Sequence, residues 1–328
     1  MQEVARILAT EMTGVESRIV DLSAVIGRAG GPGRLAFGWS WLRRELRSAR
    51  VSTLITHAPN SALFASAAAA CSGVGQRMLV VHAGSQTLGS RRVAAIQLMT
   101  SSGLINELVF VGHSLRASYP TEVEGRARVT VIQNGVRLPE GRAEQAPSAQ
   151  SGFTAVCTGR LVPTKNVGLA VEALARCRTD ARLAVFGEGP ERSGLEARAS
   201  EAVCFRGEVA RHVLRREYAK AQALLFPSVS EGLPLALIEA AAAGLPVVAG
   251  DLDFNREVMG DAALYAPIDS PDAWAVAIDR LASDPGMRER LAVEGRRRSE
   301  LFTVARMVGQ YERLVATGGT RGRRRRRQ

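Results

Sequence analysis

The sequence predicts an α/β protein made of two doubly wound units in series, each a parallel sheet with helices on both faces. Short apolar strands alternate with helical periodicity on both sides of a polar segment at 138–152, and such alternation is typical of parallel sheets. The chain has 328 residues, of which 46% are hydrophobic and 23% charged. These values suit two globular domains. Two such units facing each other would enclose a cleft suited to a small ligand.

The first domain is expected at residues 1–140. Residues 2–12 carry apolar residues at helical spacing, and the pattern then predicts a strand at 17–27, a loop at 27–34 and a helix at 36–49. The alternation continues with strands at 51–57, 77–82, 107–112 and 127–135 and helices at 60–71 and 90–102. Residues 141–152 are polar, lack periodicity and are predicted to form an interdomain linker.

The second domain is expected at residues 153–301, where the alternation restarts. Strands are predicted at 153–160, 181–189, 203–207, 223–228 and 245–250, with helices at 166–177, 190–201, 208–221, 233–244, 271–284 and 287–300. A further helix at 302–316 is expected to pack back on the first domain. Residues 317–328 are expected to form an arginine-rich disordered tail.

The cysteines, the first residues and the apolar stretches indicate the cellular compartment of the protein. The four cysteines have no metal-ligand spacing, so we interpret them as reduced packing residues in a reducing compartment: Cys71, Cys157, Cys177 and Cys204. The first twelve residues carry acids among the apolar positions, unlike a signal peptide. The apolar stretches at 62–75 and 233–250 do not read as membrane spans. We therefore expect a cytoplasmic protein.

The most informative stretch is 227–253, a strand, a loop with a carboxylate and the start of a helix. Glu231 precedes the helix and Glu239 lies within it. The backbone N–H groups at 232–235 have no partner inside the helix and can receive hydroxyl or phosphate oxygens. Carboxylates accept hydrogen bonds from vicinal hydroxyls, as in a sugar or a ribose. The alternative is that Glu231 only interacts with the helix dipole and Glu239 is a surface residue, although the apolar run around Glu239 argues against a solvated face.

Residues 231–249 resemble the Glu-x7-Glu motif of the family-4 retaining glycosyltransferases. The resemblance implies the GT-B fold, with two Rossmann-like domains facing a cleft. It also implies that Glu231 contacts the donor sugar and that Glu239 binds the ribose diol of the nucleotide. The loop and helix start at 232–234 would contribute further donor contacts through Gly232, Leu233 and Pro234.

Residues 157–167 resemble the family's cationic loop, in which Arg160 and Lys165 would hold the donor diphosphate. Cations suit this position because the leaving diphosphate gains negative charge as the sugar bond breaks. No metal-binding Asp-x-Asp motif stands at a suitable strand end, and the Asp-Leu-Asp at 251–253 is interpreted as a turn. We therefore expect no metal and no cofactor. Residues 205–214 resemble the loop beside the base, which implies a backbone contact near Val209.

The first half resembles the family less specifically. His82 occupies the position that contacts the donor sugar near the reacting bond, and His57 stands where an acceptor would pass. The alternative for both is a hydrogen-bonded structural histidine. The family's first strand and glycine-rich loop are missing from the pattern, because residues 30–33 precede the wrong helix. Either the start is truncated, in which case in-frame codons upstream are expected to encode this strand and a glycine-rich turn, or the protein has lost the element.

The resemblance implies retaining transfer of a sugar from a nucleoside-diphosphate sugar to a glycan or lipid-linked acceptor hydroxyl. Catalytic roles fall on His82, Arg160, Lys165 and Glu231. Other GT-B enzymes, such as a nucleotide-sugar epimerase or a sugar phosphorylase, remain alternatives. An inactive relative or a nucleic-acid-binding protein is a third alternative.

The net charge of +11 includes six arginines in the last eight residues. A basic segment is attracted to an anionic leaflet by about 1 kcal/mol per residue. The tail is therefore expected to attach the protein peripherally to the inner face of the plasma membrane, the alternative being a disordered solubilising tail. Nucleic acid is not the expected partner, because no aromatic residues interleave with these arginines.

Overall fold

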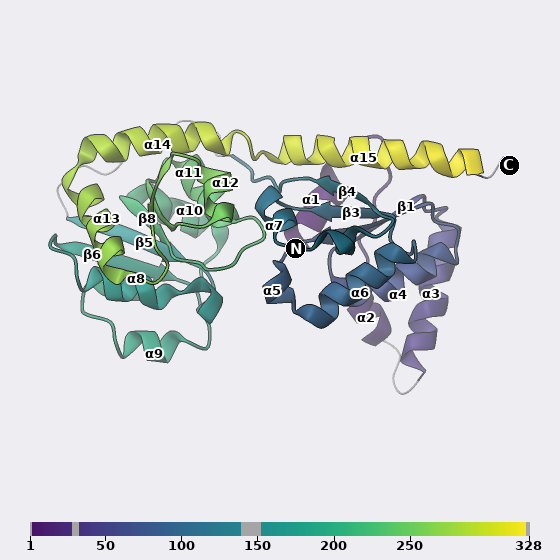
Figure 1. Ribbon diagram of the computed structural model, residues 1–328, viewed down its shortest axis with the longest axis horizontal. Coiled ribbons are helices and arrows are strands. Elements are labelled where there is room, and N and C mark those ends of the chain that lie inside the picture. The colour runs from purple at the N-terminus through teal and green to yellow at the C-terminus, as the bar shows by residue number, and fades with distance from the viewer. Residues whose placement is uncertain (1, 28–32, 139–151, 326–328) are drawn as a thin grey trace. The chain divides into compact units, whose positions relative to one another are not determined.

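The computed structural model describes residues 2–27, 33–138 and 152–325, and the chain divides into two compact units (Figure 1). The first unit comprises residues 1–134 and 304–328, and the second comprises residues 135–303. The predicted linker lies outside the described residues except for residue 152, and so does most of the predicted loop at 27–34.

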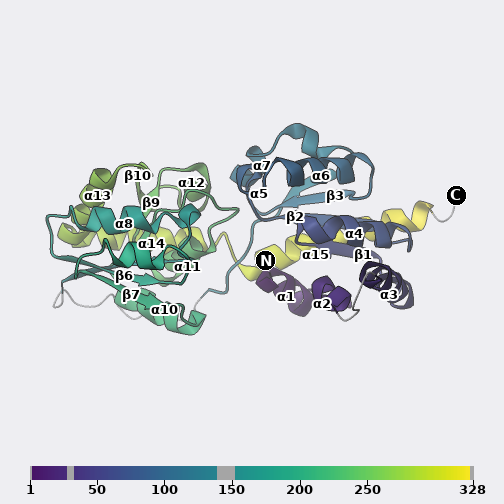
Figure 2. The ribbon, with the colours of Figure 1, turned by 90° about the horizontal axis from the view of Figure 1, so that it is seen from below.

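The first unit has a sheet of four parallel strands that are added in chain order. They are β1 (Thr53–Thr56), β2 (Gln76–Val81), β3 (Glu107–Phe110) and β4 (Arg128–Val131). Helices α4 (Pro59–Ala70) and α6 (Ser90–Ser101) cover one face, and α1 (Gln2–Glu11) and α15 (Val304–Arg325) cover the other (Figures 1 and 2). The remaining elements are α2 (Leu22–Gly27), α3 (Arg34–Ser48), α5 (Ser85–Leu88), α7 (His113–Ala117) and the 3₁₀ turn η1 (Thr121–Glu124).

The strand predicted at 17–27 is wrong. Residues 22–27 form helix α2, and within the described residues no strand precedes Thr53. The Asp21 carboxylate accepts hydrogen bonds from the backbone N–H groups of Ser23 (3.0 Å) and Ala24 (3.2 Å), the pattern of a helix N-cap. The apolar residues just before it do not enter a core, because Ile19 is 51% exposed and Val20 37% exposed.

The disordered tail predicted from residue 317 is also wrong over the part of the chain that the structure describes. Helix α15 continues to Arg325. Its buried side chains recur at helical spacing, as Met307, Tyr311 and Leu314, and Gln76 Nε2 donates to the Leu314 carbonyl at 2.9 Å. A helix nucleated by such packing can extend through arginines, which are good helix formers. None of the described helices is both long and apolar enough to cross a bilayer.

The second unit has a sheet of six parallel strands in the order β10-β9-β8-β5-β6-β7. The strands are β5 (Phe153–Thr158), β6 (Ala181–Phe186), β7 (Val203–Gly207), β8 (Ala223–Phe226), β9 (Val247–Gly250) and β10 (Ala263–Ala266). The order reverses between β5 and β8, which makes this a doubly wound sheet with a topological switch point there.

Helices cover both faces of the second sheet (Figure 1). Helices α8 (Val167–Leu174) and α13 (Pro271–Ser283) pack together on one face, where Trp274 is fully buried. The other face carries α10 (Arg211–Lys220), α11 (Leu235–Ala243) and α14 (Pro285–Ser299). The remaining elements are η3 (Pro163–Lys165), α9 (Arg192–Glu196) and α12 (Asp253–Met259).

All four cysteines are free thiols. Cys157 is buried in β5, where desolvation raises the pKa of its thiol to about 12, and Cys177 is half-buried. Cys71 and Cys204 are exposed, so the prediction that every cysteine is a packing residue is wrong for these two.

Candidate active site

The candidate site lies at the switch point of the second sheet. Open parallel sheets bind ligands at the carboxyl ends of their strands where the strand order reverses, and here β5 and β8 are neighbours. The loop after β5 carries Arg160 and Lys165, and the loop after β8 carries Glu231. The backbone N–H of Val229 donates to the Thr164 carbonyl at 3.0 Å, so the two loops are held together.

Lys165 and Glu231 form an ion pair between the two loops. The side chains are 25% and 17% exposed, respectively, so the pair is partly withdrawn from water but still accessible. The ammonium also lies 5.9 Å from the centre of the Phe226 ring at the end of β8. Arg160 is exposed in the same loop as Lys165, and no ion-pair partner for it is found within the described residues. The arrangement presents positive charge where an anionic ligand would enter.

Glu239 has a different partner. Its carboxylate lies 2.5 Å from Arg211 Nη2, with Glu239 14% and Arg211 45% exposed. Tyr218 is on the same helix as Arg211, seven residues on, and its buried hydroxyl lies 3.0 Å from Thr158 Oγ1 at the end of β5. Burial raises the pKa of Tyr218 above its usual range, so the hydroxyl stays protonated. The Glu239 carboxylate is thus anchored by α10 and remains partly exposed to solvent.

The start of α11 lies between the two acids. Gly232, Leu233 and Pro234 are buried, and the helix begins at Leu235. The Pro234 carbonyl accepts the backbone N–H groups of Leu237 and Ile238 at 3.1 and 3.4 Å, so the first turn is formed. Val209 is half-buried in the loop between β7 and α10. The contacts predicted for these four residues with the sugar and the base stay predictions.

The loop that carries Arg160 depends on close backbone packing. The Leu161 N–H donates to the Glu188 carbonyl and the Gly159 N–H to the Phe186 carbonyl, both at 2.9 Å. Gly187 has a φ of +142°, and a Cβ placed on it would stand 1.9 Å from the Gly159 carbonyl oxygen. Only glycine allows the loops after β5 and β6 to approach this closely.

Gly187→Ala is therefore expected to lower the free energy of unfolding by at least about 2 kcal/mol, because both backbone strain and a backbone clash oppose the side chain. Denaturant unfolding measures the loss. Gly194→Ala is the matched control, since a Cβ there meets nothing within 4 Å. Equal stability of the two variants would contradict the close packing.

His57 and His82 belong to the first unit, at the carboxyl ends of the adjacent strands β1 and β2. His57 Nδ1 and His82 Nε2 lie 3.0 Å apart, so one nitrogen donates to the other. Burial lowers the pKa of His57 to about 4 and that of His82 to about 3, the latter also through the neighbouring ring. Both rings are therefore neutral at pH 7. The structure brings together two residues that the sequence suggested separately.

Arg211, Tyr218 and Thr158 were missed by the sequence reasoning. The available signal was position, because Arg211 lies within the predicted base loop, two residues after Val209, and shares a helix face with Tyr218. Asp251 of the Asp-Leu-Asp segment pairs with Arg256 at 2.6 Å. No group of three or more His, Cys, Asp or Glu side chains in the described ranges is placed to hold a metal ion.

Comparisons with known proteins point to the same unit. Residues 152–284 match the family described as Glycosyl transferases group 1. An exopolysaccharide phosphotransferase of Streptomyces coelicolor is 33% identical over 57% of this chain and 20% of its own length. A GDP-mannose-dependent alpha-(1-6)-phosphatidylinositol dimannoside mannosyltransferase of Mycobacterium tuberculosis is 31% identical over 54% of this chain and 47% of its own length. The chain thus spans less than half of the length of these two curated relatives.

The solved structures extend the likeness of fold to both units. Anabaena HepE, solved in complex with UDP and glucose, aligns with 88% of this chain and 83% of its own at a TM-score of 0.73 and 17% sequence identity. The two parallel sheets, each taken by itself, are those of the GT-B fold of that structure. Residues 152–284 are therefore similar to a glycosyl transferases group 1 domain, in a chain that has the GT-B fold.

Proposed function

We propose that this chain is a retaining glycosyltransferase that moves a sugar from a nucleoside-diphosphate sugar to a hydroxyl of a glycan or lipid-linked acceptor, without a divalent metal ion. The observation that carries the proposal is the Lys165–Glu231 ion pair at the switch point of the second sheet, with the exposed Arg160 in the same loop as Lys165. It sets two cations and an acid at the place where this type of sheet binds its ligand.

In the proposed reaction, the bond between the anomeric carbon and the β-phosphate oxygen breaks while the acceptor oxygen bonds to the same face of the sugar. The acceptor proton passes to the leaving phosphate, so no separate protein base is needed. Arg160 and Lys165 stabilise the charge that develops on the diphosphate. Because Glu231 holds the Lys165 ammonium, the cation is positioned before the donor arrives.

The two acids divide the donor between them. Glu231 accepts hydrogen bonds from the sugar hydroxyls beside the backbone of residues 232–234, and Glu239 accepts those of the ribose diol. Arg211, already bound to Glu239, keeps that carboxylate oriented. The backbone near Val209 contacts the base. In the first unit, the neutral His82 forms a hydrogen bond with the sugar near the reacting bond. His57, on the acceptor side, fixes the orientation of the His82 ring through the hydrogen bond between the two rings.

Thermal melting of the full chain with a panel of nucleotide sugars tests donor binding. A ligand that binds only the native state at 100 times its dissociation constant adds about 2.7 kcal/mol of stability. The panel begins with GDP-mannose, because the Mycobacterium tuberculosis relative is described as GDP-mannose-dependent, and with UDP-glucose, because Anabaena HepE is also solved in complex with it. A donor that raises the melting temperature is then incubated with acceptors, and release of the nucleoside diphosphate and the anomeric configuration of the product are measured with and without EDTA.

We expect acceptor-dependent release of the nucleoside diphosphate, retention of configuration and no effect of EDTA. A changed sugar nucleotide formed without acceptor would instead identify an epimerase. No thermal shift with any nucleotide sugar, from a protein that melts cooperatively, would contradict the donor site altogether.

A further inference from the structure

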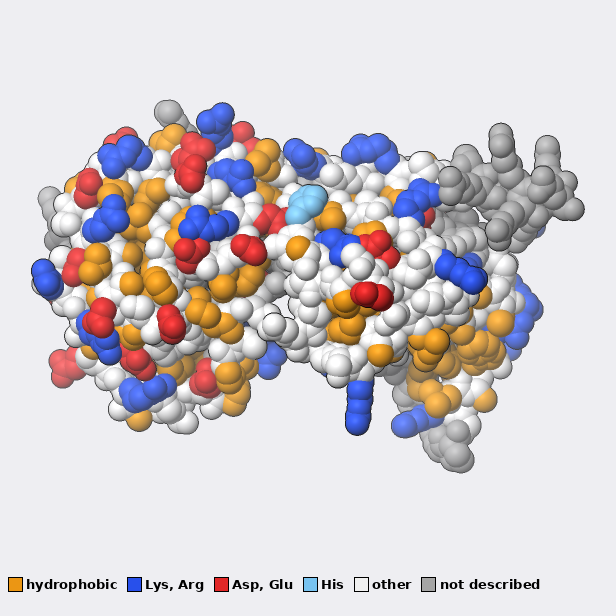
Figure 3. Space-filling model, in the orientation of Figure 1, with side chains coloured by type: hydrophobic (Ala, Val, Ile, Leu, Met, Phe, Trp, Pro, Cys, Tyr) orange, Lys and Arg blue, Asp and Glu red, His pale blue; other side chains and the backbone are white. Residues whose placement is uncertain are grey.

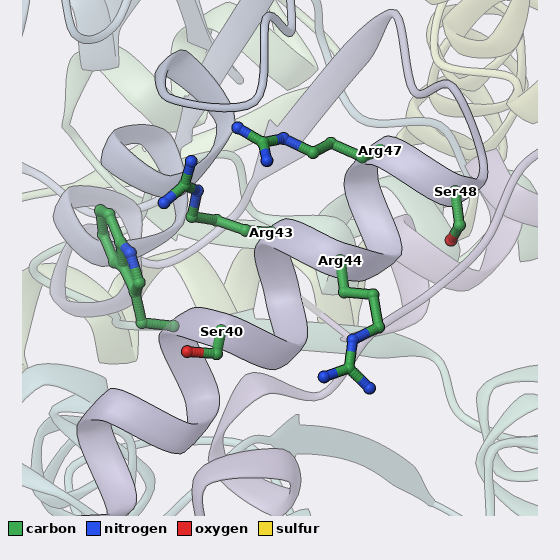
Figure 4. Close-up of a pocket in the computed structure, with 6 residues that line it drawn as sticks. Ser40, Arg43, Arg44, Arg47 and Ser48 are labelled. Carbon is green, nitrogen blue, oxygen red and sulfur yellow. The ribbon is translucent and has the colours of Figure 1, made fainter.

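Helix α3 of the first unit bears a surface hollow that the proposed donor site does not use. Its volume is about 590 Å³, and a single helix supplies all six residues that line it: Trp39, Ser40, Arg43, Arg44, Arg47 and Ser48 (Figure 4). Figure 4 shows Arg43 and Arg47 extending to the same side of the helix, while Arg44 extends to the other side. We call these six residues the α3 hollow. Because one helix lines it, the α3 hollow is an open strip and not an enclosed cavity.

The positive charge of the α3 hollow exceeds what its neighbours neutralise. Arg43 and Arg47 both donate through Nη2 to the Cys71 carbonyl at the end of α4, at 3.4 and 3.0 Å. Like charges four residues apart on a helix repel each other, and a helix end supplies only about half a negative charge. In the described part of the chain no carboxylate forms an ion pair with an arginine of the α3 hollow; Glu45, the one acid of α3, pairs with Arg18. Figure 3 shows basic and apolar side chains over the region of α3. A bound anion would relieve the repulsion.

The other side chains of the α3 hollow suit a sugar. Trp39 is half-buried, and its ring meets the ring of Phe64 edge to face, with centroids 5.5 Å apart and planes at 82°, so its orientation is fixed. Trp39, Arg43 and Arg47 follow one another at intervals of four residues and lie along one side of α3. The face of an indole ring is electron-rich and can pack against the C–H groups of a pyranose. The exposed hydroxyl of Ser40 can exchange hydrogen bonds with sugar hydroxyls.

We infer that the α3 hollow binds an acidic glycan, with carboxylates of the glycan on Arg43 and Arg47 and one sugar ring on Trp39. The two arginines are four residues apart, which is about 6 Å along a helix, and an open strip of repeated charge suits a polymer whose own charges repeat. A single phosphate or a mononucleotide would be held from one side only. A nucleic acid binds through several aromatic rings that stack on its bases, and the α3 hollow offers one ring.

The place of the α3 hollow in its unit gives the glycan a role. Helix α3 ends at Ser48, just before β1 begins at Thr53, so Arg47 lies toward the amino end of β1, whereas His57 follows the carboxyl end. At about 3.3 Å per residue, β1 separates its two ends by roughly 13 Å. Only a glycan of several sugars can reach both, and a second point of attachment raises its effective concentration at the first. This role rests on the proposed function, because it makes the glycan the acceptor.

The test titrates the full chain with an oligogalacturonate octamer, in which every sugar carries a carboxylate, and with the neutral maltooctaose, by isothermal titration calorimetry at low salt. An exposed ion pair contributes up to about a fivefold factor to affinity, so the octamer should bind at least about tenfold more tightly than maltooctaose. Arg43→Gln/Arg47→Gln should remove that advantage, while glutamine can still donate to the Cys71 carbonyl. The matched control is Arg215→Gln/Arg216→Gln, at two exposed arginines of α10, which should change the affinity less than about twofold.

A second variant tests the sugar contact apart from charge. Trp39→Leu keeps an apolar side chain against Phe64 and should weaken binding of the octamer about threefold, because the ring face is lost. Equal losses in the α3 and α10 arginine variants would overturn the inference. Binding of an oligodeoxynucleotide of equal charge, as tight as the octamer and equally dependent on Arg43 and Arg47, would overturn it too, and so would no binding of the octamer by a wild-type chain that melts cooperatively.

The same proteins separate this inference from the proposed function. Arg43→Gln/Arg47→Gln should melt cooperatively and keep the full melting shift with a nucleotide sugar, because α3 and the donor site belong to different units. A chain that binds the octamer through α3 but shifts with no nucleotide sugar would contradict the proposed function and support the glycan site. A chain that shifts with a nucleotide sugar but does not bind the octamer would overturn the glycan site alone.

Discussion

Lys165→Ala is expected to slow sugar transfer at saturating donor by about 100-fold or more. Removing a cation or hydrogen-bond donor that faces developing negative charge in a partly desolvated site lowers kcat by a factor of about 10²–10³. Lys165 is such a cation, with a side chain that is only 25% exposed. The loss should appear mainly in kcat, because the diphosphate gains charge as the sugar bond breaks. The same change also leaves Glu231 without its cation, which adds to the effect on sugar positioning.

The chain offers a matched control for this change, because it contains only two lysines. Lys220 is 70% exposed on α10 and pairs with Glu217, so Lys220→Ala should leave the rate unchanged within about twofold. Lys165→Arg keeps the charge and should restore part of the activity. Steady-state rates of nucleoside-diphosphate release measure all three. An unchanged rate in Lys165→Ala with a folded protein would remove this residue from the reaction.

Substitutions of the two acids are expected to have different effects when nucleotide binding and sugar transfer are measured separately. Glu239→Ala should weaken binding of the free nucleoside diphosphate about 10- to 100-fold, since a hydrogen bond to a charged group is worth about 1.5–3 kcal/mol. Glu231→Ala should leave that affinity within about threefold, because its ligand, the sugar, is absent from the diphosphate. It should nonetheless slow transfer at least tenfold.

Isothermal titration calorimetry with the nucleoside diphosphate and with the intact donor distinguishes the two roles. Glu172→Ala is the control, because Glu172 is an acid of the same unit whose side chain is 47% exposed and paired with Arg198. Glu239→Gln tests whether charge or hydrogen bonding matters, since glutamine can still accept from the diol and from Arg211. Equal losses in Glu231→Ala and Glu239→Ala for the bare diphosphate would contradict the division of the donor between them.

Local pattern was sufficient for most of the second unit. The strands predicted at 153–160 and 203–207 correspond to β5 and β7, because short apolar runs between turn residues have few alternatives when both faces are covered. The strand predicted at 17–27 failed for the opposite reason. Ile19 and Val20 have the residue types of a strand, but Asp21 caps a helix instead, and a strand forms only where a neighbour pairs with it.

The length of α15 could not be predicted from the local sequence pattern either. The apolar spacing predicted a helix to residue 316, and the arginine-rich composition of the residues that follow predicted a solvated tail. The extension to Arg325 follows helical packing on the first unit, in which Tyr311 is fully buried and Gln76 of β2 bonds the Leu314 carbonyl. That contact joins residues 238 positions apart, so no window of sequence contains it.

For the site, the sequence by itself determined which side chains were candidates: two acids with seven residues between them around a helix start, two cations after a strand, and two histidines at strand ends. Only the tertiary structure decided their partners. The reversal of strand order puts β5 beside β8 and so pairs Lys165 with Glu231. The packing of α10 on α11 puts Arg211 on Glu239, and the pairing of β1 with β2 joins the two histidine rings. Spacing along a chain specifies residue types and local faces, whereas strand order and helix packing decide which of them meet, because they depend on burying apolar surface across the whole unit.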